Sequence, residues 1–353
     1  MNKEKSTAFM LKVVSDVAAG MTVSLVHVGD RVGLFKAMAG AGPLRTAELS
    51  QRSGVRERYL DEWLAAMYCA GYVEHDAEAQ TWTLPEEHAL FFARDDAETY
   101  LGGLFKGAPG LAAMAPRLAE AFETGQGISF QDFGADAPMA LEHMNRAVYE
   151  ARLVKVWLPT MPAVVQALQG GGRAIDIGCG TGVIPVVLAQ AFPTARVGGL
   201  DFDALSLDLA RERAARAGVG ERVDFIQASA SEWTPEPGAY DFVSSFDCIH
   251  DLGDPLGALQ RMREALAPGG TALIVEPRVA ERLADDVGNP FARMLHGISC
   301  LHCVPQGIAQ GGPALGACWG EAKARLLARE AGFGSFEALP IRSPAQAFYA
   351  LRA

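Results

Sequence analysis

The sequence lacks the features that mark several large classes of protein. No run of about 18 uncharged apolar residues occurs, which argues against a membrane span. The first twenty residues interrupt their apolar positions with charges and have no signal-peptide cleavage site, so we expect a cytoplasmic protein. Basic residues are also scarce. Because 31 Lys and Arg face 42 Asp and Glu, for a net charge of −11, nucleic acid is an unsuitable partner.

Cysteines are few and irregularly spaced. Six in a chain of 353 residues do not form the pattern of a disulfide framework and fit reduced thiols. Half of the residues are apolar and only 21% are charged, so the chain is long and apolar enough for two domains, each with a core. An acidic protein of this kind is expected to bind small molecules.

The first part of the chain has the order of a winged-helix unit. The segment TAELSQRSG predicts a short helix with Thr46 as its N-cap and Gly54 as its stop. Residues 60 to 67 then place four large apolar side chains at helical spacing, which predicts an amphipathic helix. The segment GYVEHDAEAQTWTL predicts two strands around a polar turn.

Winged-helix units often bind DNA, but the charges of this one oppose it. In the expected recognition helix, Arg56 and Arg58 are offset by Glu57, Asp61 and Glu62, and the expected wing is also acidic. Phosphates would repel such a surface. We therefore favour a role in dimerisation over one in DNA binding.

The rest of the chain divides into a helical segment and an α/β region. The helical segment contains ETGQGISFQDFGAD, a glycine-rich loop with two phenylalanines that we expect to close over a pocket. From Arg173 on, short apolar runs alternate with helical segments, which predicts a parallel sheet covered on both faces and a closing hairpin at the C-terminus. The predicted domains are a winged-helix domain over 1–97, a helical pocket-forming segment over 98–168, and an α/β domain over 169–353 with an insertion at 277–320.

A nucleoside site is expected at the first strand of the sheet. The segment AIDIGCGTGV carries Asp176 at the end of a strand, then Gly178, Gly180 and Gly182, where the backbone can turn sharply and a ligand can approach it. The pattern is G-x-G-x-G, with Val183 at the next position, and so departs from the dinucleotide fingerprint G-x-G-x-x-G.

The next strand ends in a carboxylate suited to a ribose. Asp201 offers two oxygens that can accept both ribose hydroxyl hydrogens, and Phe202 follows it, where its ring can pack on a purine.

DIGCGTG and GLD, with LAPGG at 266–270, resemble the motifs of class I S-adenosylmethionine-dependent methyltransferases over residues 145–353. The resemblance implies a Rossmann-like sheet, with Asp176 and the three glycines near the methionine part, Asp201 on the ribose and Phe246 beside the cofactor. Ser229 stands where the family often has an acidic residue near the adenine amino group. The N-terminal half resembles the winged-helix domain of small-molecule methyltransferases, which implies a homodimer.

His250, in the segment IHDLGD, is the candidate for chemistry at the end of the fourth strand. The segment is similar to HDW-x-D of winged-helix O-methyltransferases, in which the histidine removes a hydroxyl proton. Asp251 is expected to orient water or a bound ligand, or simply to cap a turn.

A second interpretation involves His302, which lies 52 positions after His250 in the long insertion. Two imidazoles can hold a divalent metal, iron or zinc, and leave positions open for a chelating substrate. IHD followed by HC resembles the metal-dependent α-keto acid C-methyltransferases of the phenylpyruvate type. This resemblance implies methylation of the β-carbon of an α-keto acid, and this is the interpretation that the sequence leads us to prefer.

Several alternatives remain open from the sequence. His296 can replace His302, and Cys300, His302 and Cys303 with Cys318 can form a thiolate zinc site. A non-enzymatic protein can instead use the nucleoside pocket as a sensor of S-adenosylmethionine in a winged-helix regulator. The candidates for binding a substrate carboxylate are Arg146, Arg152 and Arg278.

Overall fold

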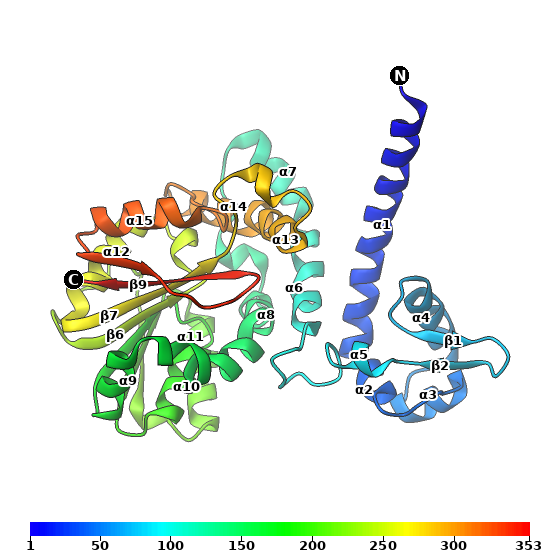
Figure 1. Cartoon of the computed structure of the whole chain (residues 1–353), viewed down its shortest axis with the longest axis horizontal. Coiled ribbons are helices and arrows are strands. Elements are labelled where there is room, and N and C mark those ends of the chain that lie inside the picture. The colour runs from blue at the N-terminus through cyan, green and yellow to red at the C-terminus, as the bar shows by residue number, and fades with distance from the viewer. The chain divides into compact units, whose positions relative to one another are not determined.

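The protein forms two compact units. The computed structural model describes residues 1–353 and divides them into a first unit of Met1–Gly110 with His143–Val148 and a second of Leu111–Glu142 with Tyr149–Ala353 (Figure 1). The domain boundaries expected after residues 97 and 168 stay predictions. Each unit is described by itself.

The first unit has the predicted order of helix, turn, helix and hairpin. The amphipathic stripe of Leu60, Trp63, Leu64 and Met67 is buried, as predicted. It packs against the first two helices, and the indole Nε1 of Trp63 donates a hydrogen bond of 2.9 Å to the carbonyl of Leu25. The elements are α1 (Lys3–Arg31), α2 (Leu34–Met38), α3 (Thr46–Ser53), α4 (Glu57–Cys69), β1 (Glu74–Asp76), β2 (Thr81–Thr83), α5 (Glu86–Ala89) and α6 (Gly102–Ala113).

The prediction for the start of α3 is wrong by one residue. Thr46 is the first helical residue, and Arg45 is the N-cap. The carboxylate of Glu48 accepts a hydrogen bond of 2.7 Å from the backbone N–H of Arg45, so the side chain in the first turn supplies the capping contact. Gly54, with φ of +74°, ends the helix as predicted.

Helix α1 is mostly exposed although it is apolar. Only Val26 and Gly29 of its 29 residues are buried. By length and composition alone it is also long and apolar enough to cross a membrane, which weakens the sequence argument against a span. Core helices of soluble proteins and signal sequences share this length and composition.

The second unit is built on a seven-stranded sheet with the order β5-β4-β3-β6-β7-β9-β8. The first five strands of this order are parallel, and β9 is antiparallel to both of its neighbours. The predicted parallel sheet and C-terminal hairpin are therefore confirmed. The strands are β3 (Arg173–Ile177), β4 (Arg196–Asp201), β5 (Val223–Gln227), β6 (Tyr240–Phe246), β7 (Leu266–Pro277), β8 (Ser335–Ala338) and β9 (Gln346–Arg352).

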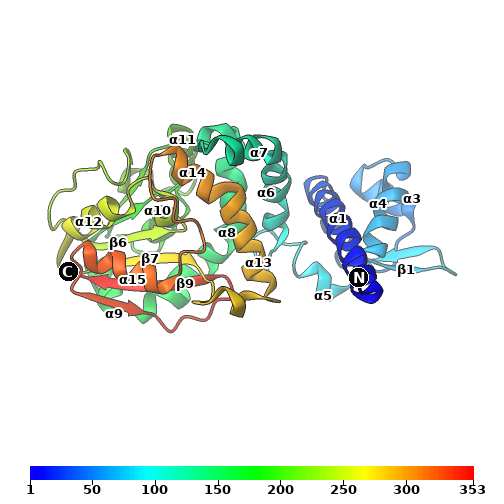
Figure 2. The ribbon, with the colours of Figure 1, turned by 90° about the horizontal axis from the view of Figure 1, so that it is seen from above.

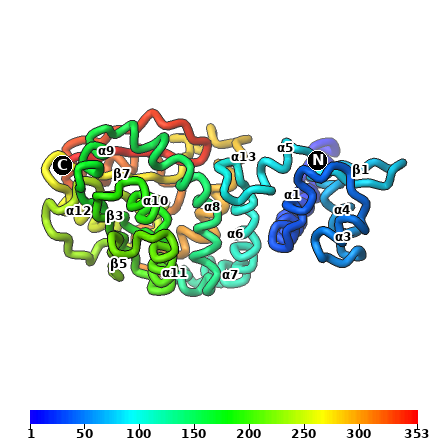
Figure 3. The backbone as a smooth tube through the Cα atoms, turned by 90° about the horizontal axis from the view of Figure 1, so that it is seen from below, coloured from blue at the N-terminus to red at the C-terminus, as the bar shows by residue number.

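Helices cover both faces of this sheet. Seen from above, α15 (Gly320–Glu330) lies across the strands, and it packs with α12 (Pro255–Ala265) on that face (Figure 2). Seen from below, α9 (Pro162–Gln169), α10 (Val183–Ala191) and α11 (Ala204–Arg216) lie in front of the strands (Figure 3). Because β3, β4, β6 and β7 are parallel, their carboxyl ends meet at one edge, where ligands bind in folds of this kind.

Helical segments precede and follow the strands around this edge. The predicted insertion after β7 folds as η6 (Leu283–Asp286), α13 (Pro290–Ile298), η7 (Ser299–Cys303) and α14 (Val304–Ala309), of which η7 is a π-helical turn. Ahead of the sheet lie α7 (Ala115–Thr124), η1 (Phe130–Phe133), α8 (Ala137–Arg152), the π-helical turn η2 (Leu153–Trp157) and η3 (Leu158–Thr160). The loop between α11 and β5 contains the short turn η4 (Gly220–Arg222).

Candidate active site

The glycine loop after β3 has a backbone that side chains would disrupt. Gly178, Gly180 and Gly182 have φ angles of +71°, +49° and +77°. A Cβ on Gly178 would lie 2.1 Å from the sulfur of Cys248, and one on Gly182 would lie 2.8 Å from the Cβ of Ala210. A Cβ on Gly180 meets no atom within 4 Å. The loop is thus tightly packed at both ends and open in the middle.

Asp176 lies beneath this loop at the end of β3 and is almost completely buried. The hydroxyl of Ser244 donates a hydrogen bond of 2.6 Å to its Oδ1. Burial raises the pKa of Asp176 to about 8, although the bond from Ser244 opposes the rise. The carboxyl group is therefore mainly protonated at neutral pH in the absence of a ligand.

Asp201 connects the glycine loop to the start of α11. Its Oδ2 accepts a hydrogen bond of 2.8 Å from the amide of Gly180, and its Oδ1 accepts one of 2.9 Å from the amide of Asp203. Burial raises the pKa of this carboxyl group too. Asp203 caps α11 by accepting a hydrogen bond of 2.8 Å from the amide of Ser206. Both oxygens of Asp201 thus have a fixed orientation beside the open part of the loop.

The other predicted cofactor residues differ in exposure. The ring of Phe202 is 39% exposed and lies 5.8 Å from the ring of Phe130. The hydroxyl of Ser229 lies 3.2 Å from that of Ser231, just after β5. Phe246 is buried at the end of β6, where its ring packs against Tyr149 at 5.3 Å, so it belongs to the aromatic core. A cofactor contact by Phe246 stays a prediction.

His250 lies in the short turn η5 (Ile249–Asp251) and is paired with a residue that the sequence analysis missed. Its Nδ1 contacts Oε2 of Glu276, a buried carboxylate near the end of β7. Glu276 is held by the amide of Ile249, 3.1 Å from Oε1, and by the indole N–H of Trp319, 3.0 Å from Oε2. The clue in the sequence was an acidic residue that interrupts the apolar run TALIVEP.

The environment of His250 is strongly anionic. Burial lowers the pKa of this imidazole, but the carboxylates of Glu276 and Asp251 outweigh burial and raise the pKa well above its ordinary value. These carboxylates thus favour the protonated form of the ring.

Asp251 lies between the two histidines that the sequence singled out. Its Oδ1 is 3.3 Å from Nε2 of His250, and its Oδ2 is 3.8 Å from Nδ1 of His302. The thiol of Cys303 also lies here, because ligand atoms of His250, Asp251 and Cys303 are all within 4.8 Å of one another. Burial lowers the pKa of His302 and raises that of Cys303 to about 12.

The phenylalanine loop lies against the same cluster. Phe133 is centred 4.6 Å from the ring of His302, and Phe130 is centred 6.3 Å from it. The loop is tied to α14 by a hydrogen bond of 3.0 Å from the amide of Ile128 to the carbonyl of Pro305. One side of His302 is thus covered by aromatic rings.

The other residues proposed as metal or substrate ligands are not found beside Asp251. Nε2 of His296 is bonded at 3.0 Å to Asp286, so His302 and not His296 is the histidine beside Asp251. Cys300 is exposed whereas Cys303 is buried, and the cluster with His250 and Asp251 contains Cys303 and not Cys300. Of the three arginines considered, Arg278 is exposed and Arg152 is half-buried, and the assignment of a carboxylate ligand stays a prediction.

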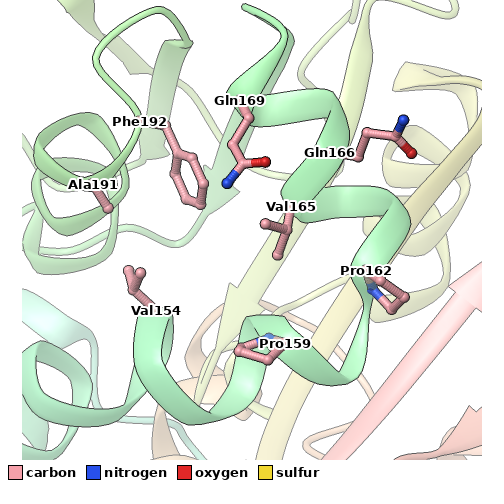
Figure 4. A pocket seen from close by; sticks show the side chains of 8 residues that line it. All are labelled: Val154, Pro159, Pro162, Val165, Gln166, Gln169, Ala191 and Phe192. Carbon is pink, nitrogen blue, oxygen red and sulfur yellow. The ribbon is translucent and has the colours of Figure 1, made fainter.

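A hollow of about 490 Å³ lies elsewhere in the second unit (Figure 4). Its lining includes Gln169, the last residue of α9, and Phe192, the residue after α10. Gln169 lies just before β3 in the chain and Phe192 just before β4, so the hollow is near the amino ends of these strands. It is therefore at the edge of the sheet opposite the candidate site. Val154, Pro159, Pro162, Val165, Gln166 and Ala191 complete the lining.

Two family models match the chain. A methyltransferase domain matches residues 168–331, and an Rv2258c-like winged HTH domain matches residues 19–94. Trans-aconitate 2-methyltransferase of Paracidovorax citrulli is 37% identical over 31% of this chain and 40% of its own length. Demethylmenaquinone methyltransferase of Staphylococcus aureus is 33% identical over 30% of this chain and 43% of its own length. The chain spans about half or less of the length of the curated relatives it matches.

Solved structures match nearly the whole chain. A putative O-methyltransferase from Nostoc punctiforme has a TM-score of 0.70 at 19% identity and covers 97% of this chain and 98% of its own. Human N-acetylserotonin methyltransferase has a TM-score of 0.67 at 14% identity, and the match covers 100% of this chain and 99% of that protein's chain. At such identities the likeness shows the fold.

These matches confirm the predicted fold class, a Rossmann-like methyltransferase sheet preceded by a winged-helix domain. They also confirm the prediction of a methyltransferase domain. None of the relatives and structures named here is described as an α-keto acid C-methyltransferase.

Proposed function

We propose that this chain, which carries a class I methyltransferase domain behind a winged-helix domain, methylates a small molecule held beside His250. S-adenosylmethionine, bound along the glycine loop and Asp201, supplies a methyl group activated by its positively charged sulfur. The proposal is supported by the glycine loop, Asp201 and His250, which all follow carboxyl ends of neighbouring parallel strands.

The observation that carries the proposed chemistry is the contact between His250 and Glu276. A carboxylate on Nδ1 fixes the ring orientation and holds the Nδ1 proton, so that Nε2 is the atom able to accept a proton from the acceptor. In O-methylation, Nε2 takes the hydroxyl proton while the oxygen bonds to the methyl carbon and the carbon–sulfur bond breaks. Because the pKa of His250 is raised, a higher pH is needed to form the base, and turnover by this route should increase with pH.

A second candidate is metal-assisted methylation at the β-carbon of an α-keto acid. It is supported by the contacts of His250 and His302 with opposite oxygens of Asp251, which bring two imidazoles to one carboxylate, and these are ligand types that suit iron or zinc. The ion would act as a Lewis acid on the ketone and carboxylate oxygens and so acidify the adjacent C–H. In this case Nε2 of His250 is a ligand and cannot also accept a proton, so the two candidates exclude each other.

One experiment tests the proposal and separates the candidates. The protein is incubated with S-adenosylmethionine labelled at the methyl carbon and a panel of phenols and 2-oxo acids, with and without a chelator, and the label is located by NMR. Label on oxygen that is indifferent to chelator supports the base. Label on carbon that is lost with chelator and restored by iron or zinc supports the metal. Asp201→Asn, which should weaken cofactor binding, is the control.

We also propose that α1 pairs two copies of the chain, as the likeness to winged-helix methyltransferases implied. Many of its large apolar residues are exposed, and exposed apolar surface of this kind marks interaction sites. The exposed residues are Phe9, Met10, Leu11, Val13, Val14, Val17, Met21 and Val28.

Light scattering tests this pairing. The native chain should have the mass of two copies, Val14→Glu with Val17→Glu should lower it to one, and Ser15→Glu, a polar position of the same helix, should leave it unchanged. A native chain that is monomeric, or that sediments with lipid vesicles instead of pairing, would contradict the proposal.

A further inference from the structure

Cys303 lies beside His250 and Asp251 but has no part in the chemistry proposed above. Its side chain is buried, and the ligand atoms of the three residues are all within 4.8 Å of one another. We infer that the sulfur of Cys303, Nε2 of His250 and Oδ1 of Asp251 together form a site for a thiophilic divalent ion of the zinc, cobalt and ferrous class. Binding at this site does not depend on which acceptor is methylated. Only its catalytic use rests on the second candidate function.

The separation of Nε2 and Oδ1 matches two ligands of one ion. The atoms are 3.3 Å apart, yet Oδ1 of Asp251 is buried and has no hydrogen-bond partner. They are thus near each other without being aligned as donor and acceptor. Tetrahedral coordination with bonds of about 2.0–2.1 Å places two such ligands about 3.3 Å apart. The geometry fits two atoms directed at a common third point.

The surroundings hold these atoms in place. Glu276 on Nδ1 of His250 is the kind of outer carboxylate that orients a metal-binding imidazole, and Trp319 holds Glu276 in turn. The backbone carbonyl of Asp251 accepts a hydrogen bond of 3.0 Å from Nε2 of Gln310. The π-helical turn η7 ends at Cys303, and such turns often occur at functional sites.

The donor set determines which ions fit. One imidazole, one carboxylate and one thiolate favour zinc, cobalt or ferrous iron, whereas magnesium and calcium require oxygen ligands. The thiol loses its proton to solvent when sulfur binds the ion. The fourth position stays open to a substrate oxygen or to His302, which lies on the other oxygen of Asp251.

Cobalt provides a direct test that needs no turnover. The full chain is stripped with a chelator, dialysed and titrated with Co²⁺, and the near-ultraviolet spectrum is recorded, because a cobalt–thiolate bond produces a charge-transfer band. The native chain should show the band at one equivalent, Zn²⁺ should displace it, and Mg²⁺ should not. Cys303→Ser should abolish the band and weaken cobalt binding by more than about tenfold, about 1.4 kcal/mol. Cys300→Ser, which changes an exposed thiol three residues away, should keep it.

The outcomes are separable. Absence of cobalt binding, binding without the band, or a band that persists in Cys303→Ser would each overturn the inference. A thermal melt and cofactor binding by calorimetry establish that the serine variant is folded. Methyl transfer by a chain that binds no cobalt would leave the proposed function intact while the ion site fails. If the protein shows the cobalt–thiolate band but methylates nothing on the panel, the ion site stands and the proposed function fails.

Discussion

The hydroxyl of Ser244 donates a hydrogen bond of 2.6 Å to Oδ1 of Asp176, its register partner on the adjacent strand. The bond stabilises the carboxylate, but burial dominates and raises the pKa of Asp176 to about 8. A folded-state pKa above the ordinary value means that ionisation costs stability. The stabilisation by the protonated carboxyl group of Asp176 is fully present at acid pH and is lost as the pH rises from about 4 to about 8.

Cofactor binding should therefore depend on pH through Asp176. The positive charges of S-adenosylmethionine favour the carboxylate, so binding below pH 8 should release a proton. The dissociation constant should fall by up to about tenfold per pH unit between pH 6 and 8, and then level off. Calorimetry in buffers of different ionisation enthalpy measures both effects. Asp176→Asn should remove the part of the slope due to this group, and a native slope identical to that of the variant would contradict the assignment.

His250 and Glu276 should affect turnover more than cofactor binding. His250→Ala should lower kcat by about 10²- to 10⁴-fold, since it removes the proton acceptor or metal ligand. Glu276→Gln should lower it less, by about 10- to 100-fold, because the ring loses its charged partner but stays in place. Steady-state kinetics and calorimetry with S-adenosylhomocysteine check both variants. Unchanged turnover in His250→Ala would remove this residue from the site.

The glycine loop offers a matched pair of substitutions. Gly178→Ala should destabilise the second unit, because its Cβ would overlap the sulfur of Cys248 at a φ of +71°. Gly180→Ala faces open space and should cost only about 1 kcal/mol of backbone strain, yet it should weaken cofactor binding where the loop is open. Melting curves and cofactor titrations distinguish the two. A Gly180→Ala variant that binds the cofactor normally would place the ligand elsewhere.

A second matched pair lies in α1. Gly29→Ala should destabilise the first unit by about 1–3 kcal/mol, because its Cβ would lie 2.4 Å from the ring of Trp63. Gly20→Ala is exposed with no atom nearby and should stabilise the helix by about 0.5–1 kcal/mol. Chemical denaturation measures both. Equal effects of the two substitutions would mean that α1 does not pack on Trp63.

Local patterns predicted much of this architecture. The five parallel strands, the glycine loop and the buried stripe of α4 all follow from residues close in sequence. The partner of His250 did not, because Glu276 reaches it only through the pairing of β6 with β7.

Cys303 was likewise indistinguishable from Cys300 before the fold was known. In a regular helix the two lie on nearly the same side, and the π-helical turn is what changes their relative positions. The start of α3 depended on a side chain reaching back to a backbone amide, which composition alone does not reveal.

Asp251 touches a different ring with each of its oxygens, and this makes His302 a built-in reporter. Whatever draws charge from one oxygen, whether a proton, an ion or a substrate, changes the electron density at the other. The NMR resonances of the His302 imidazole should therefore register occupancy next to His250, and a titration that follows one ring can reveal events at its neighbour.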